Sequence, residues 1–225
     1  MSEVRVDYDG DGLSEDALLP TPLAQARAWV DDAVARAAAS GDVPEPTAAS
    51  VATVDAQGVP NVRTVLVRVL DARGVGFYTG RTSAKGREVA AHPVAAVSLT
   101  WPSMFRAVRF RGRVEELGRD EVGAYFTSRP WGSRISAWAS RQSEEVGSRA
   151  DLEDEYARLA DRWPDTGSAS DVPVPDFWGG YLVVPDEVEF WAGRRSRLHD
   201  RLVFTRVGEG DLDDAASWRV HRRQP

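Results

Sequence analysis

The sequence has 225 residues, of which 42% are hydrophobic and 28% charged, a composition typical of a globular protein long enough to bury a sizeable core. Its net charge of −7 argues against nucleic-acid and membrane-surface partners, and it has no apolar run near the ~18 residues of a membrane-spanning helix. The absence of cysteine excludes disulfides, thiolate catalysis and cysteine-based zinc sites, so we expect a cytoplasmic protein.

The chain begins with an acidic, weakly periodic segment, residues 1–20, which predicts an arm in front of a single domain formed by residues 21–225. A helix follows, because Thr21 can cap its N-terminus and Pro22 suits its first position. One buried stripe of this helix is predicted by apolar residues at helical spacing: Leu23, Ala26, Trp29, Val30 and Val34. The sequence GDVPEP ends the helix.

Residues 48–80 change to a period of two, and the turn sequences DAQG and DARG predict hairpins between their strands. A short helix is then predicted, which is capped by Ser83 and ends before Pro93. Strand patterns return at residues 94–101 and 106–117.

Helical patterns follow at residues 119–130, 133–143 and 150–163, and a loop rich in Pro, Asp and Ser comes after them. Three closing strands are expected at residues 178–193, 197–206 and 217–225. In total we expect six or seven antiparallel strands, with helices inserted between runs of strands. This order predicts a mainly β protein with peripheral helices (α+β), arranged as an antiparallel barrel with the helices packed outside.

The segment RLHDR carries a row of cationic or titratable side chains. If it is extended, Arg197, His199 and Arg201 share one face, which is either a solvated strand edge or a grip on an anion. Arginines gather in four stretches: 106–113, 129–141, 194–206 and 219–223. Such local clusters on an acidic protein favour a small anionic ligand, such as a phosphate ester or a carboxylate, over a polyanion.

Several common catalytic patterns are missing. The sequence contains no phosphate-binding glycine loop of the G-x-x-x-x-G-K-[ST] or G-x-G-x-x-G type, and no G-x-S-x-G nucleophile elbow. Three widely separated histidines without cysteine argue against a zinc site. A hydrolase or a metalloenzyme therefore has little support.

Two local patterns favour phosphate binding. Tyr125, Arg129 and Ser133 are spaced by four, which predicts one helical face that can grip a phosphomonoester; ordinary helix packing is the alternative. Lys85 falls in the first helical turn behind the Ser83 cap, where free N–H groups favour an anion. Trp191 is either a buried core aromatic or, beside the arginine row, the wall of a planar ligand.

A series of motifs extends over nearly the whole chain: RTVLVR, FYTGRTSAKG, YFTSRPWGSRISAWASRQS, FWGG, VEFWAGRRSRLHDR and WRVHRRQP. In this order and spacing the sequence, from about residue 5 to its end, resembles the pyridoxine (pyridoxamine) 5′-phosphate oxidase family of FMN enzymes. The resemblance implies an FMN-binding split β-barrel that forms a homodimer, with two FMN molecules in clefts between the subunits.

The resemblance also assigns roles to residues of this chain. The implied FMN contacts are Arg63 and Lys85 at the phosphate, Tyr78, Thr79 and Ser83 nearby, and Gln142, Ser143, Trp191 and Arg201 elsewhere on the cofactor. The implied substrate contacts are Tyr125, Arg129 and Ser133 at a phosphate, Arg197 and His199 over a pyridine ring as the catalytic residues, and Arg68 touching both molecules. Arg5 and Tyr8 resemble an arm that closes over the substrate.

The reaction implied is the oxidation of pyridoxine or pyridoxamine 5′-phosphate to pyridoxal 5′-phosphate, by hydride transfer from the C4′ carbon to flavin N5 and reoxidation of the flavin by O₂ to give H₂O₂. A related oxidase of the phenazine pathway, acting on a bulkier carboxylated ring, is one alternative. A non-catalytic flavin- or pyridoxal-phosphate-binding module is another.

Several positions depart from the family pattern. Arg68 stands in place of the usual lysine and Ala107 in place of a glutamine that addresses the flavin ring. Ala84 replaces an arginine beside Lys85, for which Arg81 or Arg87 are possible substitutes. Arg134 and Ser136 replace a glutamine and a glycine. Loss of the side chain at position 107 is expected to weaken FMN binding or to leave space beside the ring.

Overall fold

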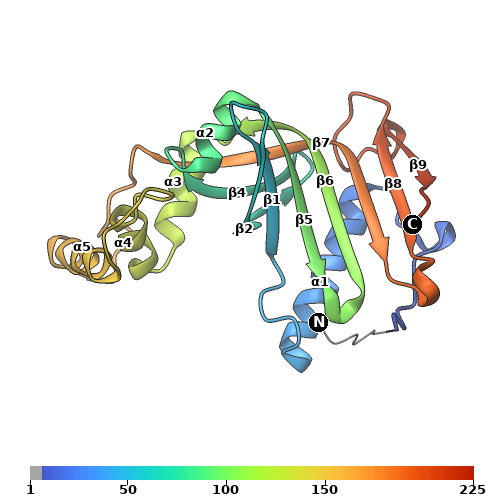
Figure 1. Cartoon of the computed structure of the whole chain (residues 1–225), viewed down its shortest axis with the longest axis horizontal. Helices are drawn as coiled ribbons and strands as arrows, with labels where there is room; N and C mark the ends of the chain where they lie inside the picture. Colours follow the sequence, from blue (N-terminus) through green and yellow to red (C-terminus); the bar gives the residue numbers. More distant parts are fainter. Residues whose placement is uncertain (1–6) are drawn as a thin grey trace.

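An antiparallel sheet of nine strands forms the centre of the computed structural model, which describes residues 7–225 (Figure 1). The strands are β1 (Ala48–Val54), β2 (Pro60–Leu66), β3 (Val69–Asp71), β4 (Gly74–Gly80), β5 (Val94–Trp101), β6 (Arg106–Glu116), β7 (Trp178–Ala192), β8 (Asp200–Arg206) and β9 (Trp218–Arg222). They pair in the order β2-β1-β5-β6-β7-β4-β3, and β8 and β9 continue from β7. The expected mainly β architecture is confirmed, but the expected number of strands was too small.

The long strand β7 splits the sheet. One of its edges pairs with β6, whereas the other pairs with β4 through its first half and with β8 through its second half. Between these halves the register with β6 shifts at Arg111/Gly112. A Cβ atom at Gly112 would lie 2.1 Å from the carbonyl oxygen of Val184, so only glycine permits this close approach of the two strands. The result is an open half-barrel with two wings.

Helix α1 (Pro22–Ser40) covers one face of the sheet (Figure 1). The Thr21 hydroxyl accepts a hydrogen bond from the Ala24 N–H at 3.1 Å, as the sequence predicts for a capping residue. Trp29 packs edge-on against Phe190 of β7, with ring centroids 5.3 Å apart. The predicted stripe was wrong at Val34, which is 49% exposed, because the phase of the helix turns Ala33 inward instead.

The opposite face of the sheet carries small and charged side chains. Cross-strand pairing places Ser98 beside Arg109, and Thr100 beside Ala107. These four residues are exposed or half-buried, whereas their neighbours Val97, Leu99 and Val108 point into the core. The strands therefore alternate between a packed apolar face and an open face on which polar groups can meet a ligand or another chain.

The remaining helices are α2 (Ala84–Ala91), α3 (Arg119–Ser128), α4 (Trp131–Ala139) and α5 (Arg149–Arg162), and short 3₁₀ turns cover Glu15–Ala17, Pro102–Met104, Arg195–Arg197 and Ala215–Ser217. Helices α3, α4 and α5 lie at one end of the molecule, beyond the start of β7 (Figure 1). They enclose a core of their own, which includes Phe126, Ile135 and Leu159.

Two local predictions were wrong. Tyr125, Arg129 and Ser133 do not share a helix, because α3 ends at Ser128 and Arg129 adopts an extended backbone before Pro130. Ser133 belongs to the next helix, α4.

The RLHDR segment is not one extended strand. Trp191 pairs with Arg201, so the chain must reverse its direction between them. The reversal uses left-handed residues, Ser196 at φ 57° and Arg197 at φ 62°, and β8 begins only at Asp200. The alternation that predicted one cationic face therefore does not apply to Arg197 and His199.

Within the described part of the chain, no helix combines the length and the apolar character that a membrane crossing requires.

Candidate functional site

A buried lysine stands at the junction of β4 and α2. Lys85, the only lysine of the sequence, is 5% exposed, and its ammonium group donates to Gln142 Oε1 at 2.9 Å, Thr79 Oγ1 at 3.1 Å and Ser83 Oγ at 3.4 Å. Thr79 also donates to Gln142 at 2.6 Å. Ser83 caps α2, as predicted, by accepting from the Gly86 N–H. We call Thr79, Ser83, Lys85 and Gln142 the cationic cradle.

The electrostatics of the cationic cradle suit an anion. Burial, reinforced by the positive charge of Arg63, lowers the pKa of Lys85 to about 8, although Glu88 opposes this shift. The three hydrogen-bond partners of the ammonium group are neutral oxygens, so none of them balances its charge. A phosphate group would supply that balance, and the hydroxyl groups and the start of α2 would supply further donors.

Arg63 lies near the cradle but is bound to a carboxylate. Its guanidinium forms an ion pair with Glu88 at 2.6 Å and donates to Thr53. Glu88 is 7% exposed and also accepts from the Asn61 amide at 2.9 Å. Burial acts to raise the pKa of Glu88, but these hydrogen bonds hold it below its usual value. The carboxylate therefore stays ionised and fixes the direction of Arg63.

Arg129 borders a pocket of about 460 Å³ beside the cradle. Its guanidinium lies over the Trp178 ring at 4.6 Å, and its buried Nη1 atom has no hydrogen-bond partner in the described structure. Burial lowers the pKa of Arg129, so an anionic partner would be stabilising. Gln142 lines the same pocket. Tyr125 stacks on Tyr78 at 3.8 Å, immediately before Thr79 in the chain.

An aromatic corner forms at the far end of β7, where Trp191 and His199 lie 4.7 Å apart between ring centroids. Tyr8 meets both rings edge-on, at 6.0 Å and 5.3 Å, and packs on Phe105 at 5.0 Å. The Nδ1 atom of His199 accepts a hydrogen bond from the Arg194 N–H at 3.1 Å. In the neutral ring this leaves the proton on Nε2, which can donate to a ligand.

Trp191 also belongs to a row on the open face of the sheet. It pairs with Ala107 of β6 on one side and with Arg201 of β8 on the other. Arg201 forms an ion pair with buried Glu189 at 2.8 Å. Ala107, which stands where the family pattern has a glutamine, therefore lies in one row with Trp191 and Arg201. The family resemblance assigns both of these residues to the flavin.

Other predicted residues stand apart. Arg68 is exposed and donates to Thr47 Oγ1 at 3.3 Å. Ser143 is exposed with φ 76°, Ser133 is half-buried at the start of α4, and Arg197 is exposed. Arg5 lies outside the described residues.

The structure shows what the arginines near Lys85 and in α4 contact. Arg81 contacts Glu116 and a backbone carbonyl, and Arg87 contacts the Thr82 carbonyl, so neither reaches into the cradle in place of the side chain missing at Ala84. Arg134 is buried, and its guanidinium holds the loop after α5 through the Ser168 and Ala169 carbonyls.

The predicted residues thus form two groups at opposite ends of β7. Arg129 rests on Trp178 at the start of this strand, whereas His199 rests against Trp191, thirteen residues further on. At roughly 3.3 Å per residue, about 40 Å of strand separates them. Figure 1 shows β7 running from the helical end of the molecule to the far wing of the sheet. One small ligand cannot touch both groups of a single chain.

Sequence reasoning missed two carboxylates, Glu88 and Glu189. Glu88 lies three residues after Lys85 on the same helix face, and Glu189 lies two residues before Trp191 on the same strand face. Both spacings are visible in the sequence, but their arginine partners depend on strand pairing.

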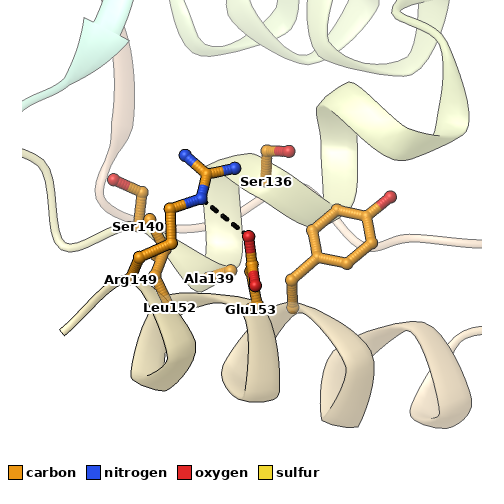
Figure 2. Close-up of a pocket in the computed structure, with 7 residues that line it drawn as sticks. Ser136, Ala139, Ser140, Arg149, Leu152 and Glu153 are labelled. Atoms are coloured by element: carbon orange, nitrogen blue, oxygen red, sulfur yellow. Dashed lines mark hydrogen bonds and ion pairs between the residues drawn. The ribbon is translucent and has the colours of Figure 1, made fainter.

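A further hollow of about 330 Å³ lies between α4 and α5 (Figure 2). Arg149 and Glu153 form an ion pair across its mouth at 2.7 Å, beside Ser136 and Ser140. None of the predicted site residues lines this hollow.

Comparison with known proteins gives a consistent result. The profile of the family described as pyridoxamine 5′-phosphate oxidase matches residues 35–162, and the profile of the pyridoxine 5′-phosphate oxidase C-terminal dimerisation region matches residues 178–225. A pyridoxine/pyridoxamine 5′-phosphate oxidase of Kineococcus radiotolerans is 52% identical over 98% of this chain and 97% of its own. The protein of the same name from Burkholderia multivorans is 45% identical over 100% and 99%.

Solved structures share the fold. The structure of PhzG from Burkholderia lata 383, in complex with tetrahydrophenazine-1-carboxylic acid, has a TM-score of 0.81 at 28% identity and covers 96% of this chain and 99% of that one. An FMN-binding protein related to pyridoxamine 5′-phosphate oxidase, from Nostoc punctiforme, has a TM-score of 0.64 at 16% identity, with coverage of 88% and 97%.

The half-barrel and the comparisons together define the class of FMN-dependent split-barrel oxidoreductases. The chain belongs to the pyridoxamine 5′-phosphate oxidase family. Its cofactor is FMN, and the unbalanced charge of Lys85 among hydroxyl and amide oxygens fits the phosphate of that cofactor.

Proposed function

We propose that the protein oxidises pyridoxine 5′-phosphate or pyridoxamine 5′-phosphate to pyridoxal 5′-phosphate, with O₂ as the electron acceptor and H₂O₂ as the second product. The observation that carries this proposal is Arg129, whose buried Nη1 atom lacks a partner and whose pocket adjoins the cradle. A phosphomonoester would satisfy that atom with a charge-assisted hydrogen bond. Relatives that carry the oxidase name over the full chain length support the same substrate class.

The FMN phosphate would be held by Lys85, Thr79, Ser83 and Arg63. Bound FMN supplies the two-electron redox chemistry that amino-acid side chains lack. Glu88 holds Arg63 by an ion pair, so a fixed guanidinium would stand beside the ammonium group of the cradle. Further FMN contacts would come from Tyr78, Gln142, Ser143, Trp191 and Arg201, with Arg68 between cofactor and substrate.

The substrate would be held at both of its ends. Tyr125, Arg129 and Ser133 would bind its phosphate, while Arg197 and His199 would face its pyridine ring as the catalytic residues. His199 donates from Nε2, because Nδ1 is occupied by the Arg194 N–H. This tautomer favours hydrogen bonding to a polar ring substituent over proton abstraction. Tyr8 would cover the ring from the arm formed by residues 1–20.

The distance along β7 supports a homodimer. The phosphate group of the substrate lies a few bonds from its ring, yet the two sets of residues that would bind them lie about 40 Å apart along the strand. A second copy, related by two-fold symmetry, would bring Arg129 of one chain to His199 of the other. The match of residues 178–225 to a dimerisation region supports this arrangement.

We also propose that residues 21–225 form a single FMN-binding domain preceded by the arm. The arm is tied to it by a hydrogen bond from the Leu13 N–H to Asp200 at 2.9 Å and by an ion pair between Glu15 and Arg222 at 2.7 Å. A cytoplasmic location also stays a proposal, which cell fractionation tests.

A second candidate function is oxidation of a bulkier carboxylated ring, as in the phenazine pathway. The specific observation in its favour is Ala107, which leaves the row beside Trp191 and Arg201 without its amide side chain. The likeness to PhzG, a protein solved with tetrahydrophenazine-1-carboxylic acid, points the same way.

Aerobic turnover of the FMN-loaded protein separates these candidates. Pyridoxine 5′-phosphate, pyridoxamine 5′-phosphate and tetrahydrophenazine-1-carboxylic acid are supplied in parallel, and product and H₂O₂ are followed together. Stoichiometric pyridoxal 5′-phosphate and H₂O₂ support the proposal. Turnover of the phenazine acid alone refutes it in favour of the second candidate, and bound flavin without any turnover indicates a binding module.

A further inference from the structure

Glu189 lies at the centre of a cluster of arginines on the open face of the sheet. Its carboxylate is 6% exposed and accepts from Arg201 through Nε at 3.1 Å and Nη2 at 2.8 Å and 3.0 Å. Arg109 donates to it at 3.0 Å and Arg223 at 3.2 Å. These three guanidinium groups converge on one buried carboxylate from strands β6 and β8 and from the residues after β9.

Glu187, two residues earlier on β7, is a natural comparison. It accepts from Arg109 at 3.1 Å and from Arg223 at 2.9 Å and 3.2 Å, so it shares two of the three arginines. Arg201 is bound to Glu189 alone of these two carboxylates. The two glutamates therefore differ in their contact with Arg201, the strand partner of Trp191.

The hydrogen bonds of Arg201 leave one of its N–H groups free to bind a ligand. Its Nε and Nη2 atoms are engaged by Glu189, and one N–H of Nη1 donates to the Gln224 carbonyl at 2.9 Å. The second N–H of Nη1 remains available. The side chain is 23% exposed and its strand partner is Trp191, so Arg201 lies on the same open face as that ring.

We propose that Glu189 is a positioning residue: it holds Arg201 in the single orientation in which the guanidinium reaches the flavin. The inference rests on the proposed function, because it takes Arg201 as a flavin contact. Glu189 itself is too enclosed by arginines to serve as a ligand of the cofactor.

The proposal predicts that neutralisation of Glu189 weakens FMN binding, whereas charge repulsion alone predicts that it strengthens FMN binding. FMN is an anion, so a glutamate that acted only through its negative charge would weaken FMN binding, and its neutralisation would strengthen it. If Glu189 acts through Arg201, neutralisation frees a flexible arginine that must be ordered again on binding, and FMN binding weakens.

The test measures the dissociation constant of FMN by quenching of flavin fluorescence, together with the visible circular dichroism of the bound flavin. We expect Glu189→Gln to raise the dissociation constant at least about tenfold, a loss comparable to one charge-assisted hydrogen bond. The matched control Glu187→Gln, which keeps the Arg201 contact, should change it less than about threefold. In an Arg201→Ala background, Glu189→Gln should have no further effect.

Other outcomes overturn either the positioning role of Glu189 or the assignment of Arg201 to the flavin. Tighter or unchanged FMN binding in Glu189→Gln, with weaker binding in Arg201→Ala, overturns the positioning role. Equal losses in the two glutamate variants overturn it as well, because Arg201 would then not be the mediator. An unchanged dissociation constant in Arg201→Ala overturns the flavin assignment of Arg201 within the proposed function. If melting curves show that Glu189→Gln does not fold, Arg201→Lys replaces it: this variant keeps the charge but not the two-pronged contact, and it should also weaken FMN binding about tenfold.

Discussion

Replacement of Arg129 by alanine is the most direct trial of the substrate assignment. The guanidinium of Arg129 is already held against the Trp178 ring, and its buried Nη1 atom has no partner in the described structure, so this donor is free to bind a ligand. A hydrogen bond of this kind to a charged group contributes about 1.5–3 kcal/mol. Arg129→Ala should therefore raise KM for pyridoxine 5′-phosphate by about 10- to 150-fold.

The assay is steady-state formation of pyridoxal 5′-phosphate by FMN-saturated protein. Arg141→Ala is the matched control, because Arg141 lines the same pocket but its side chain is 85% exposed, so its loss should leave KM within about threefold of the wild-type value. Pyridoxamine, which lacks the phosphate, serves as a second control, because Arg129→Ala should leave KM for this substrate unchanged. An unchanged KM, or an equal loss with the unphosphorylated substrate, would refute the assignment of Arg129 to the phosphate.

Four further predictions concern the cofactor, the stability of the apoprotein and the dimer. The apoprotein should bind FMN with nearly constant affinity from about pH 7, where the FMN phosphate is a dianion, to the Lys85 pKa of about 8, and up to tenfold more weakly per pH unit above it, whereas Lys85→Arg should show no such decline; titrations from about pH 7 to 9.5 check this. Because the unfolded lysine keeps its proton to higher pH, the contribution of Lys85 to apoprotein stability should rise over the same alkaline range, which urea unfolding measures against Lys85→Arg. Ala107→Gln should tighten FMN binding about two- to tenfold through one new hydrogen bond, and an unchanged dissociation constant would place position 107 away from the flavin. Subunits carrying Arg129→Ala and His199→Ala, each weakly active alone at substrate concentrations below the wild-type KM, should regain about a quarter of wild-type activity at those concentrations when mixed, because a hybrid dimer holds one intact site; no recovery would indicate sites built within single chains.

The sequence predicts the structure best where one local interaction decides the outcome. Thr21 and Ser83 cap their helices because a hydroxyl at the helix start satisfies a free N–H whatever the rest of the fold does. Lys85 follows from the same reasoning, since its place in the first turn of α2 is local.

Prediction failed where the chain changes direction. Periodicity placed Arg129 in a helix, although Pro130 restricts the residue before it to an extended backbone. Alternation placed Arg197 in a strand, but the reversal between Trp191 and Arg201 requires left-handed residues that no pattern of hydrophobicity reveals. Those two failures concern backbone path, and both change which side chains share a face.

The roles of Glu88 and Glu189 could not be read from the sequence for a different reason. Each carboxylate finds its arginine across strands that are distant in the chain, so the partner is known only after the register is known. A buried carboxylate next to an expected anion site looks unfavourable in isolation, and it becomes understandable only as the counter-charge that orients an arginine.

The scarcity of lysine has a practical side. Every basic side chain of this protein other than Lys85 is an arginine or a histidine, so an amine-directed reagent meets the chain terminus and a single side chain. Burial lowers the pKa of that side chain to about 8, so a larger fraction of it is uncharged at mildly alkaline pH than of an exposed lysine. Under the proposed binding of the FMN phosphate by Lys85, the fraction of the Lys85 amine protected from acetylation or reductive methylation would report how much of the protein carries its cofactor.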